Sequence, residues 1–583
     1  MSSFEPLFDQ AGRPNRALAC LTALALSAVA LAGVERDLAE KTTHRYISNS
    51  PESTIDTLTD QGYRLFDIEV TGTSPLRYGG SFVKNTGPYQ SAWWWTANKT
   101  KAQFIEYYTS RGARVLDLEV YRVNGEKRYA GTFVPSSNRA GTWMWFEDLT
   151  FQQMLDQADS KGMRITDLDF ETISGVRKFS GVMIRNAGAE HKDWVAFSNL
   201  TSDEIKEKMS ARSMRIVDIE RISDTRFAGV LQEREGQATW YFTNRTWETV
   251  QWLQDQYGSR IIDIERHTVG KDVRFNVLLI NNANDLEWTI GQMLRAGSDG
   301  TRGFILKQVN GPILGELMPT FRTYPASTIK VLEHYYWSRR IGNGMSPQTL
   351  VPIYTNHTSD THVQSDVATN QSLQLTMQQM MRPSNNQSAN ALQEFAGNGN
   401  GATGRTNINN FAYNTLGLTD DIKLNHKFAN GNVANDPYNI MTMRQIAALY
   451  ENFAESTALN PVGWNFFHDN MLNEIGTGGS QFGNGVLVVM QQEGAAIGMT
   501  NAEVNQVFNQ IVLCWKPGNV TGYNSTAGWI RVPYKTVRGT VFKEFVLAAF
   551  QDDFTNNPLG NLSGTVMPEI LRGELADALL TWN

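Results

Sequence analysis

The chain has 583 residues, a formal net charge of −7 and 41% hydrophobic residues. This length exceeds what one hydrophobic core normally serves, so we expect at least two folded units. The apolar content is high enough to offset the entropy of ordering, which excludes disorder as the default state. The acidic balance lacks the basic footprint that neutralises a phosphate backbone, so we predict no nucleic-acid partner.

The first 32 residues have the pattern of a secretory signal. An uncharged segment from Ala17 to Ala32 follows two arginines and ends in Ala30-Leu31-Ala32, small residues that suit signal peptidase. A membrane anchor is the alternative, but about 16 apolar residues fall short of the roughly 20 that span a bilayer. We therefore predict a signal peptide over 1–32, a secreted, extracellular protein, and no membrane partner after cleavage.

Cysteine and sequon usage add two expectations. Cys20 and Cys514 are the only cysteines, and cleavage of the signal would leave one thiol and no internal disulfide. Packing alone must then stabilise the folded chain. Asn-x-Ser/Thr sequons predict a glycoprotein if a eukaryote secretes the chain, and they include Asn98, Asn199, Asn244, Asn356 and Asn524.

The first half of the chain repeats a motif, Arg-x-x-Asp-(Ile/Leu)-(Glu/Asp), at a period of about 50 residues. Four copies continue with a basic residue, an aromatic and small residues, as in Arg77-Tyr78-Gly79-Gly80. A tryptophan-containing segment and an amphipathic stretch of helical spacing follow, with capping signals such as Asn98-Lys99-Thr100. We predict units of three strands and a helix, four full and a partial fifth, over 45–292. The five motif aspartates are Asp67, Asp117, Asp167, Asp218 and Asp263.

The repeated aspartates and tryptophans each allow two interpretations. A row of carboxylates would suit a metal or cationic ligand, whereas a structural role would have each Asp cap a turn or pair with an arginine of the next unit. Repetition in every unit favours the structural role. The tryptophans, including the run Trp93-Trp94-Trp95, are either stacking platforms for sugars or extended chains, or the shared core of the repeats.

A different pattern follows the repeats, and its first element is a predicted β-hairpin. The apolar runs Phe304-Ile305-Leu306 and Ile313 to Leu317 flank an Asn310-Gly311 turn signal. We place a second domain over 300–583.

Beyond the hairpin, Tyr324-Pro325-Ala326-Ser327-Thr328-Ile329-Lys330 leads into a helical run. Ser327 is predicted at the helix N-terminus with Lys330 one turn on, so that both side chains face the same space. A serine hydroxyl is a poor nucleophile until a base takes its proton, and a desolvated lysine amine can do so. Alone, Ser-x-x-Lys recurs by chance in many chains.

Two further motifs follow in order. Ser384-Asn385-Asn386 offers a second hydroxyl with an amide two residues away, and Lys516-Pro517-Gly518 ends an apolar strand from Ile511 to Trp515. The set resembles the serine β-lactamase and penicillin-binding-protein superfamily, whose signatures are Ser-x-x-Lys, Ser-Asp-Asn and Lys-Thr-Gly. The resemblance covers residues from about 300 to 583.

The resemblance implies roles for the matching residues. Ser327 would be the acylated nucleophile, Lys330 its general base, Ser384 the proton shuttle to the leaving group, and Asn386 a contact to a substrate amide. Lys516 would supply positive charge beside Ser384.

The last motif also implies an oxyanion hole. Gly518 and Asn519 would line the substrate, and the backbone N–H groups of Ser327 and Asn519 would bind the oxyanion. Two departures from the family matter here. Asn385 replaces the usual Asp, and Pro517 replaces the hydroxyl that helps hold a substrate carboxylate, which argues against recognition of a free C-terminus.

A third departure lies in Leu424 to Asn430, where similar β-lactamases place the glutamate that activates the deacylating water. No carboxylate occurs there before Asp436. Lys330 and Ser384 would then have to activate that water, which favours a peptidase over a lactamase.

We predict no metal and no cofactor. The eight histidines include no HExxH or clustered ligand spacing. His357, His362 and His426 are interpreted as separate, solvated loop residues.

Repeats, a secretory leader and a lactamase-like domain together resemble the polyglycine hydrolases, secreted fungal proteins. The predicted fold class is α+β, with tandem repeats before a β-lactamase or transpeptidase-like domain. The resemblance implies a monomeric serine endopeptidase and virulence factor that cuts Gly-Gly bonds in the polyglycine linkers of plant defence chitinases. The alternatives are a β-lactamase or D-Ala-D-Ala carboxypeptidase, and a non-catalytic binding protein that uses its repeats.

Overall fold

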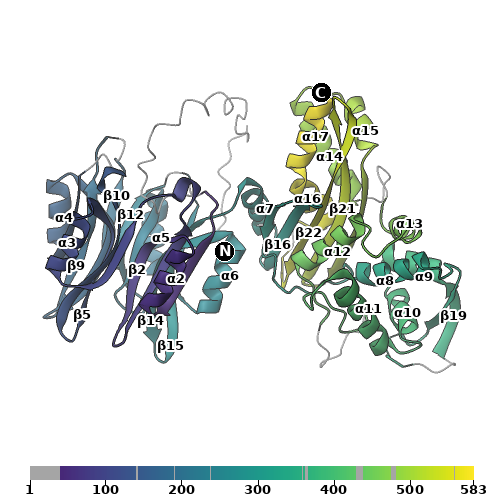
Figure 1. Ribbon diagram of the computed structural model, residues 1–583, viewed down its shortest axis with the longest axis horizontal. Helices are drawn as coiled ribbons and strands as arrows, with labels where there is room; N and C mark the ends of the chain where they lie inside the picture. The colour runs from purple at the N-terminus through teal and green to yellow at the C-terminus, as the bar shows by residue number, and fades with distance from the viewer. Residues whose placement is uncertain are drawn as a thin grey trace. The chain divides into compact units, whose positions relative to one another are not determined.

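A computed structural model describes residues 40–583 apart from a few short internal segments, and the chain divides into two compact units (Figure 1). The C-terminal unit consists of Gln251–Ser259 and Ala283–Asn583, and the N-terminal unit holds the other described residues. The predicted signal peptide lies outside the described residues, as do 139–141, 189–190, 235, 237, 358, 362–365, 429–437, 474–480 and 557–558. Within the described ranges, no helix is both long and apolar enough to cross a membrane.

Between His44 and Asn281 the chain repeats one arrangement five times: a strand, a helix and a β-hairpin. All of it belongs to the N-terminal unit except the stretch from Gln251 to Ser259, which includes most of the fifth helix. The second hairpin strand is the middle of an antiparallel three-stranded sheet, as in the order β1-β3-β2. The five copies are β1 (His44–Ser50), α2 (Glu52–Asp60), β2 (Tyr63–Thr73) and β3 (Leu76–Lys84); β4 (Trp94–Lys99), α3 (Lys101–Thr109), β5 (Ala113–Val123) and β6 (Glu126–Pro135); β7 (Trp143–Leu149), α4 (Phe151–Ser160), β8 (Met163–Ile173) and β9 (Val176–Arg185); β10 (Trp194–Leu200), α5 (Ser202–Ala211), β11 (Met214–Arg221) and β12 (Phe227–Glu233); and β13 (Thr239–Arg245), α6 (Trp247–Tyr257), β14 (Ser259–Val269) and β15 (Asp272–Asn281).

The predicted unit of three strands and a helix is confirmed, but the described chain holds five complete copies rather than four and a partial fifth. The difference comes from strand pairing. The tryptophan strand β4 pairs with β6, which follows it, with Trp94 opposite Phe133. Each tryptophan strand therefore opens a unit instead of closing one.

The helix starts confirm the predicted capping signals. The Thr100 hydroxyl accepts a hydrogen bond from the backbone N–H of Gln103, and Thr201 accepts one from Glu204. These threonines satisfy amides that a helix N-terminus leaves unpaired. The asparagines two residues earlier occupy the left-handed region, with φ of 54° at Asn98. The recurrent Asn-x-Thr triplets thus have a structural function in the repeats.

The glycine that ends each basic-aromatic-small motif allows two strands to approach. A Cβ added to it would lie only 2.1 to 2.6 Å from the carbonyl oxygen of the motif aspartate in the neighbouring strand. That contact is far too short for any side chain, so only glycine fits this position. The residues concerned are Gly80, Gly131, Gly181 and Gly229.

Each motif aspartate after the first joins its unit to the preceding one. Oδ2 of Asp117 accepts a hydrogen bond of 2.9 Å from the backbone N–H of Ile68, and Asp167 accepts one from Leu118 at the same distance. Asp218 and Asp263 make the equivalent bonds of 3.0 and 3.1 Å to Leu168 and Ile219. The aspartates pair buried amides between strands, which favours the structural interpretation.

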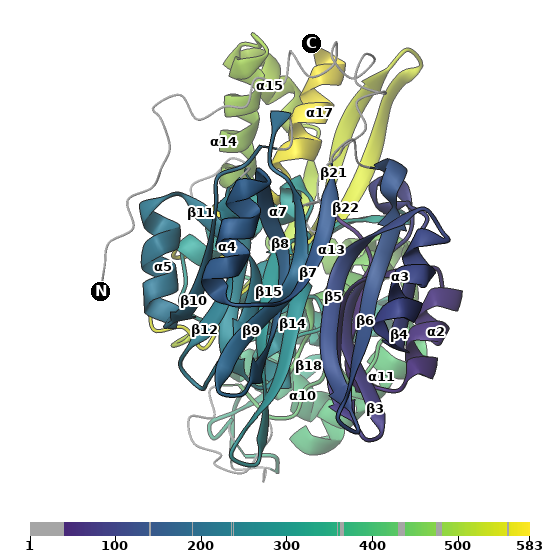
Figure 2. The same ribbon diagram turned by 90° about the vertical axis from the view of Figure 1, so that its left-hand side faces the viewer.

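The first and fifth copies also touch, so the repeats close into a ring. Thr42 N–H donates to Asn282 Oδ1, and Asn282 Nδ2 donates back to Thr42 O, both at 2.9 Å. The rings of Tyr46 and Trp247 pack edge to face 4.7 Å apart. In Figure 2, α5 lies at one edge of this unit and α2 and α3 lie at the other, with strands between them.

The C-terminal unit contains a five-stranded antiparallel sheet in the order β17-β16-β22-β21-β20. The predicted hairpin is confirmed as β16 and β17, in which Ile305 lies opposite Glu316. The sheet strands are β16 (Thr301–Gln308), β17 (Ile313–Leu317), β20 (Val512–Val520), β21 (Tyr523–Thr536) and β22 (Gly539–Asp552), and β18 (Leu350–Tyr354) pairs with β19 (Val367–Ser372). The helices are α7 (Asp285–Ala296), α8 (Lys330–Gly342), α9 (Leu373–Met381), α10 (Asn386–Ala396), α11 (Gly401–Leu416), α12 (Met443–Ala454), α13 (Pro461–Asn470), α14 (Gln481–Ala496), α15 (Asn501–Phe508), α16 (Leu562–Ile570) and α17 (Arg572–Trp582).

The C-terminal unit begins earlier than the boundary predicted at 300. Helix α7 belongs to it, because Asn284 Nδ2 donates to Leu314 O at 2.9 Å and Glu316 N–H donates to Glu287 Oε1 at 3.0 Å. The central helix α8 is almost entirely buried. Cys514 is a buried free thiol.

Candidate active site

Ser327 lies in the turn that leads into α8. Thr328 N–H donates to Pro325 O at 3.0 Å, and Lys330 N–H donates to Ser327 O at 3.2 Å. Ala326 has a φ of +46°, which is unfavourable for a residue with a Cβ and is typical of functional sites. Ser327 is half-buried, and its hydroxyl has no hydrogen-bond partner among the described residues, so it is free to meet a substrate.

Lys330 extends from the first turn of α8 to the second motif. Its Nζ donates to Ser384 O at 2.7 Å and to Asn386 Oδ1 at 2.5 Å, and it lies 3.4 Å from Ser384 Oγ. Burial lowers the pKa of Lys330 to about 7, while the nearby Glu333 acts to raise it. Burial raises the pKa of Glu333 to about 8, so at pH 7 only a minority of these carboxyls carry the charge that would hold a proton on Lys330. A free lysine amine is therefore accessible near neutral pH.

Ser384 Oγ lies between the two motif lysines. Lys516 Nζ donates to it at 2.9 Å and to Pro517 O at 3.1 Å. Burial, together with the charge of Lys330, lowers the pKa of Lys516. The structure thus brings Lys330, Ser384, Asn386 and Lys516 into one hydrogen-bonded cluster, and a hydroxyl in this position can pass a proton between two amines.

Asn385, which departs from the family pattern, caps α10. Its Oδ1 accepts a hydrogen bond of 2.8 Å from the backbone N–H of Ser388. Asn and Asp are equally good N-caps, so the substitution keeps the helix start. Ser384 adopts a left-handed φ of +63° immediately before it, so the cap fixes the turn that carries Ser384 and Asn386.

Strand β20 extends past the third motif instead of ending with it, because Asn519 and Val520 also stay paired with β21. Pro517 is tolerated since β20 is an edge strand. A Cβ on Gly518 would lie 2.7 Å from the backbone nitrogen of Ser327 and 2.5 Å from Pro325 O. Glycine therefore lets β20 lie directly against the nucleophile turn, with Asn519 next along the strand.

A buried hydroxyl network that no sequence motif indicates joins that turn to the sheet. Ser525 Oγ donates to Pro325 O at 2.7 Å and lies 2.9 Å from Thr328 Oγ1, which donates to Lys516 O at 3.3 Å. Thr328 follows the nucleophile in sequence, but only the pairing of β20 with β21 brings Ser525 to it.

Phe428 lies beside Lys330, on the segment where the resemblance implies a glutamate in similar β-lactamases. Its ring centroid is 4.8 Å from Lys330 Nζ, and the residue is 3% exposed. Asn390 holds its backbone with hydrogen bonds of 2.9 and 2.8 Å. The adjacent Lys427 forms a buried ion pair with Glu394. Within Leu424 to Phe428 no carboxylate is present, and Asp436 lies outside the described residues.

His426 is buried, contrary to the prediction of a solvated residue. Its backbone N–H donates to Asn439 Oδ1 at 3.0 Å, and its ring lies 6.1 Å from that of Tyr324. His357 is half-buried, and His362 lies outside the described residues.

In the N-terminal unit, the carboxylate oxygens of Asp67, Glu69 and Asp263 lie within 4.8 Å of one another, a spacing that a hard cation could bridge. Burial, together with the charges of neighbouring acids, raises the pKa of Glu69 well above its ordinary value. Proton sharing is therefore an equally good account of this acidic cluster.

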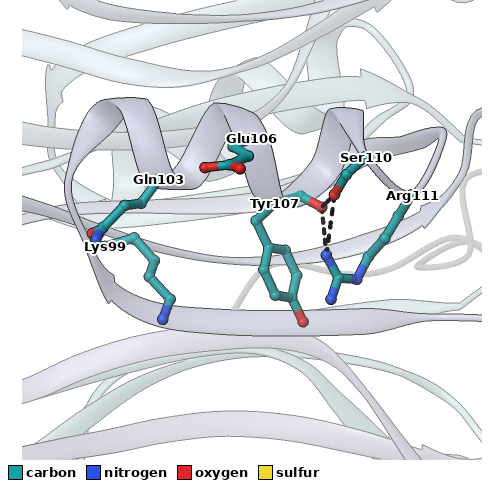
Figure 3. Close-up of a pocket in the computed structure, with 6 residues that line it drawn as sticks. All are labelled: Lys99, Gln103, Glu106, Tyr107, Ser110 and Arg111. Atoms are coloured by element: carbon teal, nitrogen blue, oxygen red, sulfur yellow. Dashed lines mark hydrogen bonds between the residues drawn. The ribbon is translucent and has the colours of Figure 1, made fainter.

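A shallow hollow of about 240 Å³ lies along α3 (Figure 3). Arg111 donates to Tyr107 O at 2.9 Å and covers the Tyr107 ring at 3.8 Å. The hollow belongs to a different unit from Ser327 and contains none of the predicted site residues. Its lining consists of Lys99, Gln103, Glu106, Tyr107, Ser110 and Arg111.

Both halves of the chain match known protein families. Residues 286–544 match the β-lactamase enzyme family, and residues 38–85 and 96–136 match the polyglycine hydrolase-like structural repeat. A solved structure of PBP-A is 15% identical with a TM-score of 0.37, covering 50% of this chain and 96% of its own. A β-lactamase from Sphaerobacter thermophilus is 16% identical with a TM-score of 0.36, covering 50% of this chain and 98% of its own. No curated protein matches the sequence. The chain therefore contains one region that matches the polyglycine hydrolase-like structural repeat and a second region that matches the β-lactamase enzyme family.

Proposed function

We propose that this protein is a serine endopeptidase that cleaves Gly-Gly bonds in polyglycine linkers of chitinases through an acyl-enzyme on Ser327. The observation that carries the chemistry is the hydrogen-bonded cluster of Lys330, Ser384, Asn386 and Lys516 beside the half-buried Ser327. The choice of substrate is supported by the polyglycine hydrolase-like repeats.

In the acylation step, the neutral amine of Lys330 takes the proton of Ser327 Oγ, and the oxygen attacks the carbonyl carbon of a glycine. The backbone N–H groups of Ser327 and Asn519 stabilise the oxyanion that forms. When the C–N bond breaks, the leaving amine receives a proton through Ser384 Oγ, which lies 3.4 Å from Lys330 Nζ. Acylation thus releases the C-terminal fragment and leaves an ester on Ser327.

In the deacylation step, water attacks this ester, and Lys330 with Ser384 accepts its proton. Phe428 supplies no carboxylate to activate that water at its position beside Lys330. A peptide acyl group leaves room for water, whereas hydrolysis of a long-lived penicilloyl ester depends on an additional base. This chemistry favours a peptidase.

The decisive experiment incubates the purified protein with a chitinase that carries a polyglycine linker and locates the cuts by intact-mass spectrometry. The wild type is expected to cut within the linker, and the Ser327→Ala variant is expected to leave it intact. If neither the wild type nor the variant cuts the linker, the proposed substrate is wrong.

A second candidate is a β-lactamase or D-Ala-D-Ala carboxypeptidase, which the family match of residues 286–544 favours. Pro517 lacks the hydroxyl expected to hold a substrate carboxylate. Hydrolysis of a chromogenic cephalosporin, or labelling of Ser327 by a fluorescent penicillin without linker cleavage, would place this candidate first. A protein inert in all of these assays would be a binding protein that acts through its repeats.

We also propose that the protein is secreted after processing at residue 32 and acts as a monomer and virulence factor in the extracellular space. N-terminal sequencing of the protein recovered from the culture medium of its source organism tests the leader. A start upstream of Ala32 would contradict processing at that site.

A further inference from the structure

Four aromatic side chains gather beside the nucleophile turn, and the proposed chemistry does not use them. The ring of Tyr324 has its centroid 5.3 Å from that of Tyr523, 5.5 Å from that of Tyr438 and 6.1 Å from that of His426. Tyr324 precedes Ser327 by three residues, so their Cα atoms lie at most about 11 Å apart. A substrate chain bound at Ser327 therefore passes these rings within a few residues.

Hydrogen bonds hold the backbone of this cluster in place. Asn425 Nδ2 donates to Tyr438 O at 2.7 Å, and Asn439 Oδ1 accepts from the N–H groups of Asn425 and His426 at 2.7 and 3.0 Å. A backbone that is already held by hydrogen bonds has less conformational entropy to lose when a ligand binds.

The anchoring continues on the nucleophile side of the cluster. Asp552 Oδ2 accepts hydrogen bonds from Tyr324 N–H at 3.1 Å and from Thr323 Oγ1 at 2.6 Å. Tyr523 opens β21 and pairs with Val520, one residue beyond Asn519, so it is fixed to the strand that carries the proposed oxyanion amide. The rings thus have a defined position relative to the reacting groups.

The cluster is nevertheless open to solvent. Tyr438 is 70% exposed, and Tyr324 and Tyr523 are half-buried. Aromatic rings that are fixed through their backbone and still exposed next to a reactive serine are typical of a binding surface. Aromatic faces accept weak hydrogen bonds from N–H and Cα–H groups, so they can bind a bare polypeptide backbone.

We propose that Tyr324, Tyr438 and Tyr523, packed against the buried His426, form a subsite that binds an extended, glycine-rich stretch of the substrate chain. This inference rests on the proposed function and deepens it. Without a Cβ, a glycine backbone can lie flat against the rings, whereas each alanine methyl holds the chain away from them. The subsite would therefore select glycine through backbone contact, because glycine offers no side chain for a pocket.

Binding to the inactive protein tests the subsite separately from cleavage. The Ser327→Ala variant is titrated with a soluble oligoglycine peptide and with a matched oligoalanine peptide, and calorimetry gives each Kd. We expect tighter binding of oligoglycine. In the Ser327→Ala background, Tyr438→Ala is expected to weaken oligoglycine binding about tenfold, while Tyr438→Phe, which keeps the ring, changes it little.

Tyr523→Ala provides an independent second variant, with an expected weakening of similar size. Equal affinity for the two peptides, or unchanged oligoglycine binding in both alanine variants, overturns the subsite. Absence of measurable oligoglycine binding overturns it as well. Linker cleavage by the wild type is scored separately, so a failed proposed function and a failed subsite give different results.

Discussion

The ring of Phe428 lies 4.8 Å from the Nζ atom of Lys330 and covers the amine that is expected to act as the base. Burial lowers the pKa of Lys330 to about 7, and we expect the loss of hydration under the ring to outweigh the attraction of the ring face for the ammonium. We therefore expect Phe428 to help keep a neutral lysine amine available near pH 7.

Phe428→Ala should raise the pKa of Lys330, because water then solvates the ammonium. The rise of kcat/KM with pH, which reports the free enzyme, should move to higher pH, and activity at pH 7 should fall by about tenfold or more. Phe428→Leu, which keeps an apolar cover, is the matched control. An unshifted pH profile in a folded Phe428→Ala variant would mean that the ring does not set this pKa.

The wild-type pH profile should rise with a midpoint near pH 7. The pKa of Lys330 is lowered to about 7, and only the neutral amine can accept the serine proton, so the rate falls as pH falls through this value. Measurement of kcat/KM across pH 5 to 9 checks the expectation. A midpoint above pH 9 would show a lysine that stays charged.

Gly518→Ala should reduce kcat strongly and lower the free energy of unfolding to a smaller extent. The new methyl would lie 2.7 Å from Ser327 N, so β20 must move away from the nucleophile turn. Loss of one oxyanion donor typically costs about 100-fold to 1,000-fold in kcat. Gly573→Ala is the control, since its added methyl meets nothing within 4 Å. If Gly518→Ala keeps full kcat, the strand does not contribute to the oxyanion hole.

The repeat ring should lose stability as pH rises from about 5 to 8. Burial raises the pKa of Asp169 to about 7 and that of Glu265 to about 8, so the folded state binds more protons than the unfolded state in this interval. Stability therefore decreases with increasing pH, since unfolding there releases protons. Thermal unfolding of the full chain at both pH values should show the effect in the transition of the repeats.

Glu265→Gln should flatten this dependence and raise the melting temperature at pH 8, because the amide resembles the protonated acid. Glu248→Gln, which changes an exposed residue of α6, is a control that should leave the difference in melting temperature between pH 5 and pH 8 unchanged. A wild-type transition that is equally stable at both pH values would mean that these carboxylates ionise normally in the folded protein.

Sequence periodicity predicted the repeat composition because each unit must satisfy the same local needs. Thr100 caps a helix, and Gly181 allows one strand to pass close to another, so these requirements appear as recurrent residues. The residue at which each repeat begins could not be predicted, because strand pairing decides it. Strand β4 pairs with β6, which follows it in the chain, so β4 opens a repeat. Closure of the ring depends on contacts such as Thr42 with Asn282, 240 residues apart.

The sequence by itself determined the reactive groups of the site, because a lysine one helical turn after a serine is a local relationship. The tertiary structure decided what surrounds them. The contact of Phe428 with Lys330 joins residues about 100 positions apart, and the contact of Ser525 with the nucleophile turn joins residues about 200 positions apart. No local sequence pattern encodes contacts over such separations. Burial, and with it the pKa of Lys330, is a property of the packed fold rather than of the motif.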